Sequence, residues 1–387
     1  MQVESVDTIE AIGERDWNRL AGPRYPFLQH SFLRAAESSG CVAATTGWQP
    51  RHIAIYDPRR RLVAAMPLYE KSHSWGEFVF DWAWAEAYRR AGLGYYPKLI
   101  SAVPFTPAPA PKLLHAGPAD ANYPELLASA AVDLARDSGC SSLHVQFPLA
   151  EELSALRAAG LKLRKDCQFH WHNQGYRSFD DFLSTFNSAK RKKAKRDRRR
   201  VSEQGITFRW IRGRETDRRI WNEVHELICL TFLRRGSMPY YDTEFFLALA
   251  AAQPDNVLIV LAQQDAESIA AAVFYEGEET LYGRYWGSRA DYNALHFETC
   301  YYQGIEYCIA HGKKIFEPGT QGEHKISRGF VPVTTWSAHW LERPEFFQAI
   351  GDYLEDEQQH IDRYIEAVNT HSPYRDKAKP APGERDS

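Results

Sequence analysis

The chain has 387 residues, which is enough for two or three domains with hydrophobic cores of their own. Hydrophobic residues make up 44% of it and charged residues 25%, as in ordinary globular proteins, and the formal net charge is only -3. A charge so close to zero excludes a protein that binds nucleic acid over its whole surface, so any basic binding surface has to be local.

Neither a membrane span nor a signal peptide is predicted. The longest apolar runs, residues 257–262 and 269–275, have the length of strands and fall short of the roughly 20 residues that a membrane span needs. Residues 1–7 are acidic and lack the apolar core of a signal peptide. The six cysteines form no Cys-x-x-Cys motif, which favours reduced thiols and a cytoplasmic protein without integral membrane contact.

The first half of the chain shows the alternation of a small mixed α/β unit. Its predicted elements are two helices within residues 9–40, a β-hairpin of strands 51–56 and 61–69, a helix over 126–138 and a strand over 143–147. Residues 70–123 between them are rich in aromatic residues and proline, which predicts a long, irregular insertion. Trp82 and Tyr96 in this insertion are candidates for the aromatic wall of a substrate-binding groove.

The second half repeats the order of hairpin, helix ending at glycine, and strand. Its predicted elements are a strand pair over 256–263 and 268–275, a strand over 280–286, a helix over 296–310 and a strand over 314–316. We therefore predict an α/β (α+β) fold made by tandem duplication of one unit. The expected domains are residues 1–165, which carry the insertion, and residues 166–371, followed by a disordered tail over 372–387.

A basic helix is predicted between the two repeats. Ser178–Asp181 has the pattern of a capping box, and the helix is expected to continue through Lys190–Arg200, where nine of eleven residues are cationic. Cations on successive turns can hold several phosphates, with an affinity that falls as salt rises. Lys190, Arg191 and Lys192 are therefore candidates for binding tRNA, the phosphates of coenzyme A or an anionic lipid-linked substrate. The alternative is a solvated face whose cations pair with acidic groups elsewhere.

The segment of residues 316–330 places several titratable groups among glycines and a proline, after a predicted strand. Sites of α/β units commonly lie at such strand ends. Glu323 or His324 could take the proton of an attacking amine. Lys325 or Arg328 could hold a phosphate or an oxyanion. The alternative is a loop whose glutamate and lysine pair with each other and whose histidine is merely exposed.

A metal site is not predicted. His296, Glu298, Glu323 and His324 could meet in space, but His296 and Glu298 are two positions apart and do not share a helix face. The sequence contains no H-E-x-x-H motif, no P-loop and no dinucleotide fingerprint. We therefore expect no bound metal and no tightly bound cofactor.

Segments spread over nearly the whole chain resemble a known family. They include Thr46-Gly47-Trp48-Gln49-Pro50, Gly76-Glu77-Phe78-Val79-Phe80-Asp81, Tyr95-Tyr96-Pro97-Lys98-Leu99, Gln168-Phe169-His170-Trp171, Leu281-Tyr282-Gly283-Arg284-Tyr285-Trp286-Gly287 and the run from Glu317 to Phe330. Together they resemble the FemAB-like predicted N-acyltransferases, described as peptidoglycan biosynthesis/recognition proteins of the GNAT superfamily. The resemblance implies two tandem GNAT-like domains and transfer of an acyl or aminoacyl group to an amine, on a small molecule or a cell-wall precursor.

The resemblance also implies a phosphate-bearing co-substrate, either acyl-CoA or aminoacyl-tRNA. GNAT enzymes bind the pyrophosphate of acetyl-CoA with a Q/R-x-x-G-x-G/A turn, and residues 284–289 are the nearest match, so Arg284 and Tyr285 become candidates for donor binding. Gln321 and Arg328 are further candidates, and tRNA would bind through the basic run.

In the first repeat, the position that corresponds to the loop of residues 316–330 is occupied by residues 146–149. These residues carry no comparable titratable groups. The second repeat is therefore predicted to hold the reacting groups. Two other functions stay open, a non-catalytic module that recognises cell-wall glycan or peptide and an RNA-binding accessory protein.

Overall fold

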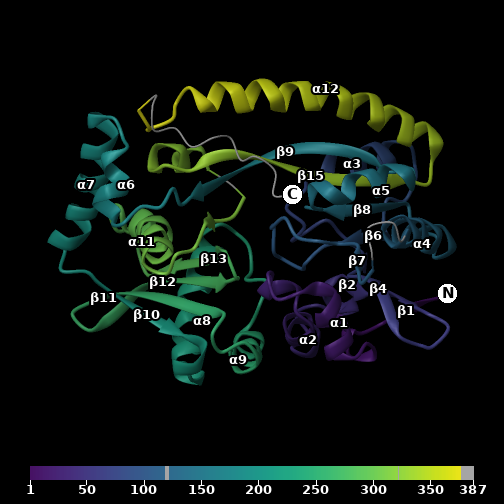
Figure 1. Ribbon diagram of the computed structural model, residues 1–387, viewed down its shortest axis with the longest axis horizontal. Helices are drawn as coiled ribbons and strands as arrows, with labels where there is room; N and C mark the ends of the chain where they lie inside the picture. Colours follow the sequence, from purple (N-terminus) through teal and green to yellow (C-terminus); the bar gives the residue numbers. More distant parts are fainter. Residues whose placement is uncertain (118–121, 321, 376–387) are drawn as a thin grey trace. The chain divides into compact units, whose positions relative to one another are not determined.

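The computed structural model describes residues 1–117, 122–320 and 322–375 (Figure 1). The chain divides into two compact units, one made of Met1–Cys167 with Thr334–Arg363 and one made of Gln168–Val333 with the described residues 364–375. Each unit combines helices with a sheet, so the predicted mixed α/β class is confirmed.

Strands of the first unit form two sheets. One has the order β1–β3–β4–β7, with bounds Gln2–Val6, His52–Tyr56, Leu62–Met66 and Leu114–His115. The other has the order β2–β5–β6–β8, with bounds Trp48–Pro50, Tyr69–Lys71, Lys98–Ser101 and Ser142–Gln146, and β15 (Val331–Leu341) pairs with β8 at its edge. The predicted hairpin is confirmed, because β3 and β4 pair antiparallel.

Helices cover these strands and bury the core of the first unit. They are α1 (Glu14–Ala21), α2 (His30–Ser38), α3 (Trp82–Arg90), α4 (Tyr123–Asp137), α5 (Leu153–Ala158) and the first part of α12 (Pro344–Asn369). The prediction placed residues 334–363 in the second domain. They belong to the first unit because Ser337–Leu341 pair with β8 and because Ile350 and Leu354 pack against Trp84 and Tyr88 of α3.

The aromatic insertion is more regular than predicted. It contains α3, β6 and β7, and residues 118–121 lie outside the described part of the chain. All four residues of β6 are buried, so the strand lacks the alternation that identifies a half-exposed strand from sequence. In α3, Trp84 and Tyr88 lie four residues apart and are both buried, which is the spacing of a helix with one face in the core.

The second unit has one sheet in the order β10–β11–β12–β13–β14–β9. The bounds are Thr207–Arg212, Val257–Gln264, Glu267–Glu276, Thr280–Ser288, Ile315–Glu317 and, for β9, Lys162–His172, of which the last five residues belong to this unit. The strands predicted over 256–263, 268–275 and 280–286 are confirmed. All neighbours are antiparallel except β13 and β14, which are parallel.

Two predicted helices of the second unit are interrupted. The helices are α6 (Phe179–Ser184), α7 (Ser188–Glu203), α8 (Arg218–Arg234), α9 (Thr243–Ala252), α10 (Leu295–Phe297), a π-helical turn (Glu298–Tyr302) and α11 (Gln303–Ala310). The predicted continuous helix from 178 breaks before α7, because the side chain of Asn187 accepts the amide of Lys190 and starts a new helix. The predicted helix over 296–310 contains the π-helical turn.

The first four residues of the predicted disordered tail, 372–375, lie within the described part of the chain. Tyr374 is buried, packs on Phe186 and donates its hydroxyl to the carbonyl of Gly329 at 2.6 Å. Residues 372–375 are therefore held in place, and the rest of the tail, residues 376–387, lies outside the described residues.

A close contact fixes α8 on the sheet of the second unit. A Cβ atom added to Gly287 of β13 would lie 2.1 Å from the carbonyl carbon of Leu227 and 2.3 Å from the amide nitrogen of Ile228. Glycine is therefore needed where the backbone of α8 approaches β13.

We predict that Gly287→Ala destabilises the protein by about 1–3 kcal/mol, because the helix backbone must move away from the strand. Urea unfolding measures the change. Gly283→Ala in the same strand is the matched control, since its Cβ would meet neighbours at 3.4 Å, an ordinary contact. Equal stability of the two variants would contradict the prediction.

Candidate functional site

Strands β13 and β14 separate in the middle of the sheet of the second unit. They pair over Thr280–Tyr282 and Ile315–Glu317, after which β13 continues to Ser288 while the chain turns away at Pro318. A parallel pair that separates at its carboxyl ends leaves an opening of the kind in which α/β folds commonly bind ligands. The loop after β14 lies at this opening.

A β-bulge marks the same point. In the pairing of β13 with β12, Phe274 faces Gly283 whereas Val273 faces Tyr285, so Arg284 is an extra residue on β13. Bulges turn a side chain away from the regular alternation and are common next to functional sites. The bulge therefore determines where Arg284 points.

Arg284 and Glu317 form a buried ion pair across the opening. Their side chains are 2% and 1% exposed, and the guanidinium contacts both carboxylate oxygens, with Nη1 at 3.1 Å from Oε1. Glu317 Oε1 also accepts the amide of Gly319 at 2.8 Å. Burial would raise the pKa of Glu317, but Arg284 and this amide outweigh it and the pKa is lowered.

This geometry changes the interpretation of two candidate donor-binding residues. Residues 284–288 lie in strand β13, where Tyr285–Ser288 pair with β12, so the nearest match to the GNAT phosphate-binding turn forms a strand. The guanidinium of Arg284 is engaged by Glu317, and Tyr285 is buried against the rings of Tyr241 and Phe246. Both side chains are therefore engaged by groups of the second unit itself.

Lys325 lies in a 3₁₀ helix, Glu323–Arg328, that follows the opening. Its side chain is buried, and Nζ donates to the carbonyl of Gly319 at 2.5 Å. Burial lowers the pKa of Lys325 to about 8, against the opposing charge of Glu317. An amine with this pKa exists in both protonation states near neutral pH and can therefore exchange protons.

Glu323 and His324 are exposed. Glu323 Oε1 accepts the hydroxyl of Tyr364 at 3.0 Å, and Nε2 of His324 lies 2.9 Å from the hydroxyl of Tyr301. Burial of part of the ring and the charges of Arg328 and Lys325 lower the pKa of His324 to about 4, so its imidazole is neutral at pH 7. The alternative in which Glu323 pairs with the lysine is wrong, because Lys325 contacts Gly319 instead.

Arg328 connects the loop to the basic helix. It is buried, its guanidinium lies 3.3 Å from the ring centre of Phe297, and Nη1 donates to the carbonyl of His324 at 2.6 Å. Nη2 lies 3.7 Å from Asp197, the acidic residue within the cationic run of α7. Arg328 therefore anchors the loop to α7. The candidate Gln321 lies outside the described residues.

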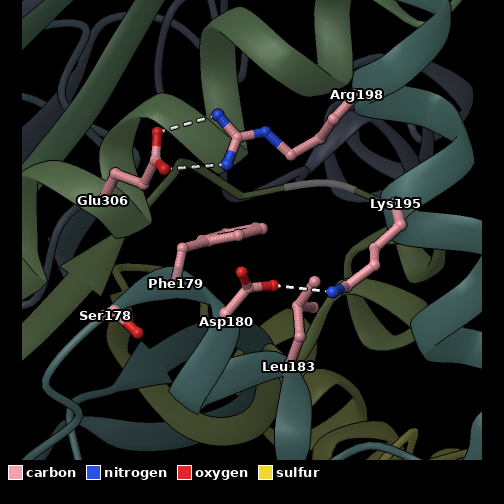
Figure 2. A pocket seen from close by; sticks show the side chains of 7 residues that line it. All are labelled: Ser178, Phe179, Asp180, Leu183, Lys195, Arg198 and Glu306. Atoms are coloured by element: carbon pink, nitrogen blue, oxygen red, sulfur yellow. Dashed lines mark hydrogen bonds and ion pairs between the residues drawn. The ribbon is translucent and has the colours of Figure 1, made fainter.

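Several cations of α7 are neutralised on the side that faces α6 and α11. Arg198 pairs with Glu298 at 2.9 Å and with Glu306 at 2.8 Å, and Lys195 pairs with Asp180 at 2.8 Å. Asp180, Lys195, Arg198 and Glu306 line a pocket of about 510 Å³ around the ring of Phe179, shown in Figure 2. The charged groups that line the pocket already pair with one another. Part of the helix therefore shows the alternative left open by the sequence, in which its cations pair with acidic groups.

The remaining cations of α7 form a second set, which we call the free face. Within the described part of the chain, these six side chains have no ion-pair partner: Lys190, Arg191, Lys192, Lys193, Arg196 and Arg200. Lys192, Lys193 and Arg196 are exposed. The free face contains all three cations proposed from the sequence and is the part of the helix that can hold phosphates.

Trp82 and Tyr96, the two candidates from the insertion, belong to the first unit. Trp82 begins α3 and is 42% exposed, and the hydroxyl of Tyr96 lies 2.8 Å from Ser74 Oγ. Sequence reasoning missed the pairing role of Glu317 and the contact of Tyr301 with His324. A carboxylate directly before Pro318-Gly319, at the end of an apolar strand, was the available signal for Glu317.

Comparison with known families identifies the chain. The model of the FemAB-like family, described as peptidoglycan biosynthesis/recognition, matches residues 8–376. The chain belongs to the FemAB-like family. No curated protein matches the sequence.

Solved structures with the same fold accompany this assignment. The FemAB-like chain is similar to FemX, with 13% identity, a TM-score of 0.55 and coverage of 91% of this chain and all of that one. A domain described as the C-terminal part of a putative lysylphosphatidylglycerol synthetase from Agrobacterium fabrum has 10% identity, a TM-score of 0.55 and coverage of 88% and 96%. L-PGS from Bacillus licheniformis has 12% identity, a TM-score of 0.51 and coverage of 84% and 96%. The tandem GNAT-like fold predicted from the sequence is confirmed.

Two further properties of the FemAB-like chain concern its described residues alone. Over residues 1–117, 122–320 and 322–375, none of the helices combines the length and apolar character needed to cross a membrane. Over the same residues, no group of three or more His, Cys, Asp or Glu side chains is arranged to hold a metal ion.

We predict that Glu317→Gln destabilises the protein by about 3–5 kcal/mol, because it leaves the buried charge of Arg284 without its partner. Thermal or urea unfolding measures the loss. The control is Glu244→Gln, which removes the partner of Arg218 in an exposed pair and is expected to change stability far less. Similar losses in both variants would show that the buried pair does not hold the opening together.

Proposed function

We propose that this protein transfers an acyl or aminoacyl group from a phosphate-bearing donor to an amine. The observation that carries the proposal is the position of Lys325, a buried amine with a lowered pKa, beside the opening between β13 and β14. Membership of a family described as peptidoglycan biosynthesis/recognition supports a cell-wall precursor as the acceptor.

The free face of α7 supports a donor that carries phosphates. Acyl-CoA and aminoacyl-tRNA both do, and the contact of Arg328 with Asp197 joins this helix to the loop that holds Lys325. The name of the Agrobacterium fabrum relative refers to a lysylated lipid, which favours an aminoacyl group. We propose a cytoplasmic location, in keeping with six free cysteines.

The reaction needs one proton transfer that this chain can perform. The acceptor nitrogen forms a bond to the acyl carbon, the bond from that carbon to the donor's sulfur or ribose oxygen breaks, and the nitrogen loses a proton. Neutral Lys325 can take that proton, and the leaving sulfur or oxygen is protonated in turn. His324 is a weaker base at neutral pH because its pKa is about 4, although it and Glu323 can still position the acceptor.

The test is a transfer assay with purified protein, with aminoacyl-tRNA and acyl-CoA as separate donors and amino-acid or amino-sugar acceptors. We expect product with one donor class. Binding of an acceptor without product from either donor would favour the alternative of a recognition module. Binding of tRNA without product would favour an RNA-binding accessory protein.

We predict that the transfer rate rises with pH through about 8, as Lys325 loses its proton. Lys325→Met should lower the rate by about 100-fold or more and abolish this rise, because the general base is removed. Lys314→Met, which changes an exposed lysine directly before β14, should leave the profile unchanged. A rise through pH 8 that persists in Lys325→Met would assign the titration to another group.

We predict that tRNA binding by the free face depends steeply on salt. The slope of log Kobs against log salt should become shallower in Lys192→Ala/Arg196→Ala, by roughly 0.7–0.9 for each phosphate that the variant no longer neutralises. The matched control is Lys195→Ala/Arg199→Ala in the same helix, which removes cations that already pair with Asp180 and Glu203. Equal slopes in the two variants would place the donor away from the free face.

A further inference from the structure

The first unit contains a buried cluster of charged groups that the sequence prediction missed. Lys98 Nζ, on β6, donates to Glu77 Oε2 and to Ser74 Oγ, both at 2.8 Å, and also contacts Asp81 Oδ2. The side chains of Lys98, Glu77 and Asp81 are 0%, 1% and 3% exposed. Glu77 and Asp81 come from the loop of residues 72–81, between β5 and α3. We call this set the Lys98 cluster.

The Lys98 cluster continues into the sheet beneath it. Tyr95 donates its hydroxyl to Asp81 Oδ2 at 2.6 Å and lies 3.1 Å from Nε2 of His144 on β8. Gln146, also on β8, donates to Glu77 Oε2 at 3.3 Å. The first unit therefore does hold titratable groups, but they come from a loop and a neighbouring strand and not from residues 146–149, where the sequence predicted none.

Two oxygens of the cluster lack a partner. Glu77 Oε1 and Asp81 Oδ1 are both sealed from solvent and have no hydrogen-bond partner among the described residues. Burial raises the pKa of Glu77 to about 7, against the opposing charge of Lys98. A buried acceptor without a donor costs about 1–3 kcal/mol, and more if it is charged, so a native site that keeps one has a reason to do so.

A second buried lysine lies next to Lys98 and, when neutral, leaves the cluster with a net negative charge. Lys71, the cross-strand neighbour of Lys98, is fully buried, and its Nζ lies 3.9 Å from the ring centre of Trp48. Burial lowers its pKa to about 7. When Lys71 is neutral and both Glu77 and Asp81 are ionised, the cluster has two negative charges and only the positive charge of Lys98. The site can then accept one further cation.

Exposed aromatic rings lie beside the cluster. Trp75 and Trp82 are 63% and 42% exposed, and their ring centres are 5.3 Å apart. The carbonyl of Trp75 accepts Lys71 Nζ at 3.2 Å, and Trp82, the first residue of α3, directly follows Asp81, so one continuous segment carries the rings and the carboxylates. Exposed indole faces attract cations and stack on apolar ligand faces.

A chain of hydroxyl groups connects the cluster to the surface. Ser74 Oγ accepts Lys98 Nζ and lies 2.8 Å from the hydroxyl of Tyr96, which is only half-buried. A ligand group that hydrogen-bonds at Tyr96 and Ser74 is therefore one step from the carboxylates.

We propose that the loop of residues 72–82 forms a binding site for a primary ammonium group, with Glu77 and Asp81 as its carboxylate partners and Trp75 and Trp82 as its aromatic wall. The ammonium supplies the donor that Glu77 Oε1 lacks and the cation that the cluster accepts. Amino sugars and lysine side chains both carry this group next to an apolar face. Identifying the ammonium as that of the acceptor rests on the proposed transfer function, whereas the binding itself does not.

Calorimetric titration of the full-length protein without any donor tests the site. The probes are glucosamine and Nα-acetyl-L-lysine amide, each compared with its N-acetylated counterpart, N-acetylglucosamine or Nα,Nε-diacetyl-L-lysine amide. We expect at least one free amine to bind about ten times or more tighter than its acetylated form. The probe that binds identifies the source of the ammonium. Equal binding of both forms, or no binding of either amine, would overturn the proposal.

Two variants assign the effect to the named residues. Glu77→Gln should lower the affinity for the amine at least tenfold and leave any binding of the acetylated form unchanged. Circular dichroism checks that the variant folds. Trp75→Ala changes an exposed side chain and should lower the affinity for the amine without unfolding the protein. The site can therefore still be tested if Glu77→Gln does not fold. Tyr353→Ala, another exposed aromatic of the first unit, is the control. Unchanged amine affinity in Trp75→Ala would contradict the site.

Because no donor is present, this binding and the proposed transfer fail separately. Amine binding without product from any donor refutes the transfer and keeps the site. Product formation with amine affinity unaffected by both variants refutes the site and keeps the transfer.

Discussion

The ion pair of Arg284 with Glu317 is the interaction on which the candidate site depends. Arg284 is the extra residue of a bulge in β13, and Glu317 is the last residue of β14, so their pairing joins two strands where the backbone ladder between them ends. Glu317 also fixes Gly319, whose carbonyl accepts the ammonium of Lys325. This series of contacts holds one lysine in a poorly solvated position, and the loss of solvation lowers its pKa.

Much of the fold followed from the sequence because its strands and hairpins have strong local patterns. The interruptions of the helices did not follow from the sequence, because each depends on a local competition between two backbone conformations. Asn187 begins a new helix by capping the amide of Lys190, although an asparagine within a polar run gives little sign of this. The apolar spacing from Phe297 to Cys308 predicts a helix but does not identify the π-helical turn inside it.

The sequence predicted which types of residue lie at the candidate site better than it predicted what each residue does there. Arg284 and Arg328 were expected to bind donor phosphates, but their partners Glu317 and Asp197 are distant in sequence, and a pairing of that kind leaves no local pattern. The Lys98 cluster was missed for a related reason, since a lysine or glutamate in the sequence does not show whether it is buried. Both units therefore keep charged groups in low-polarity surroundings, where protonation and ligand binding respond strongly to neighbours.

The loop after β14 holds Lys325 as a buried amine whose pKa is lowered to about 8. The most direct test is an NMR titration of the protein with isotopically labelled lysine, with Lys325→Arg used to assign the signal. We predict a pKa of about 8 in the free protein, and a still lower value in Glu317→Gln, because the charge of Glu317 raises it. A value of about 10.4, that of an ordinary exposed lysine, would contradict the claim.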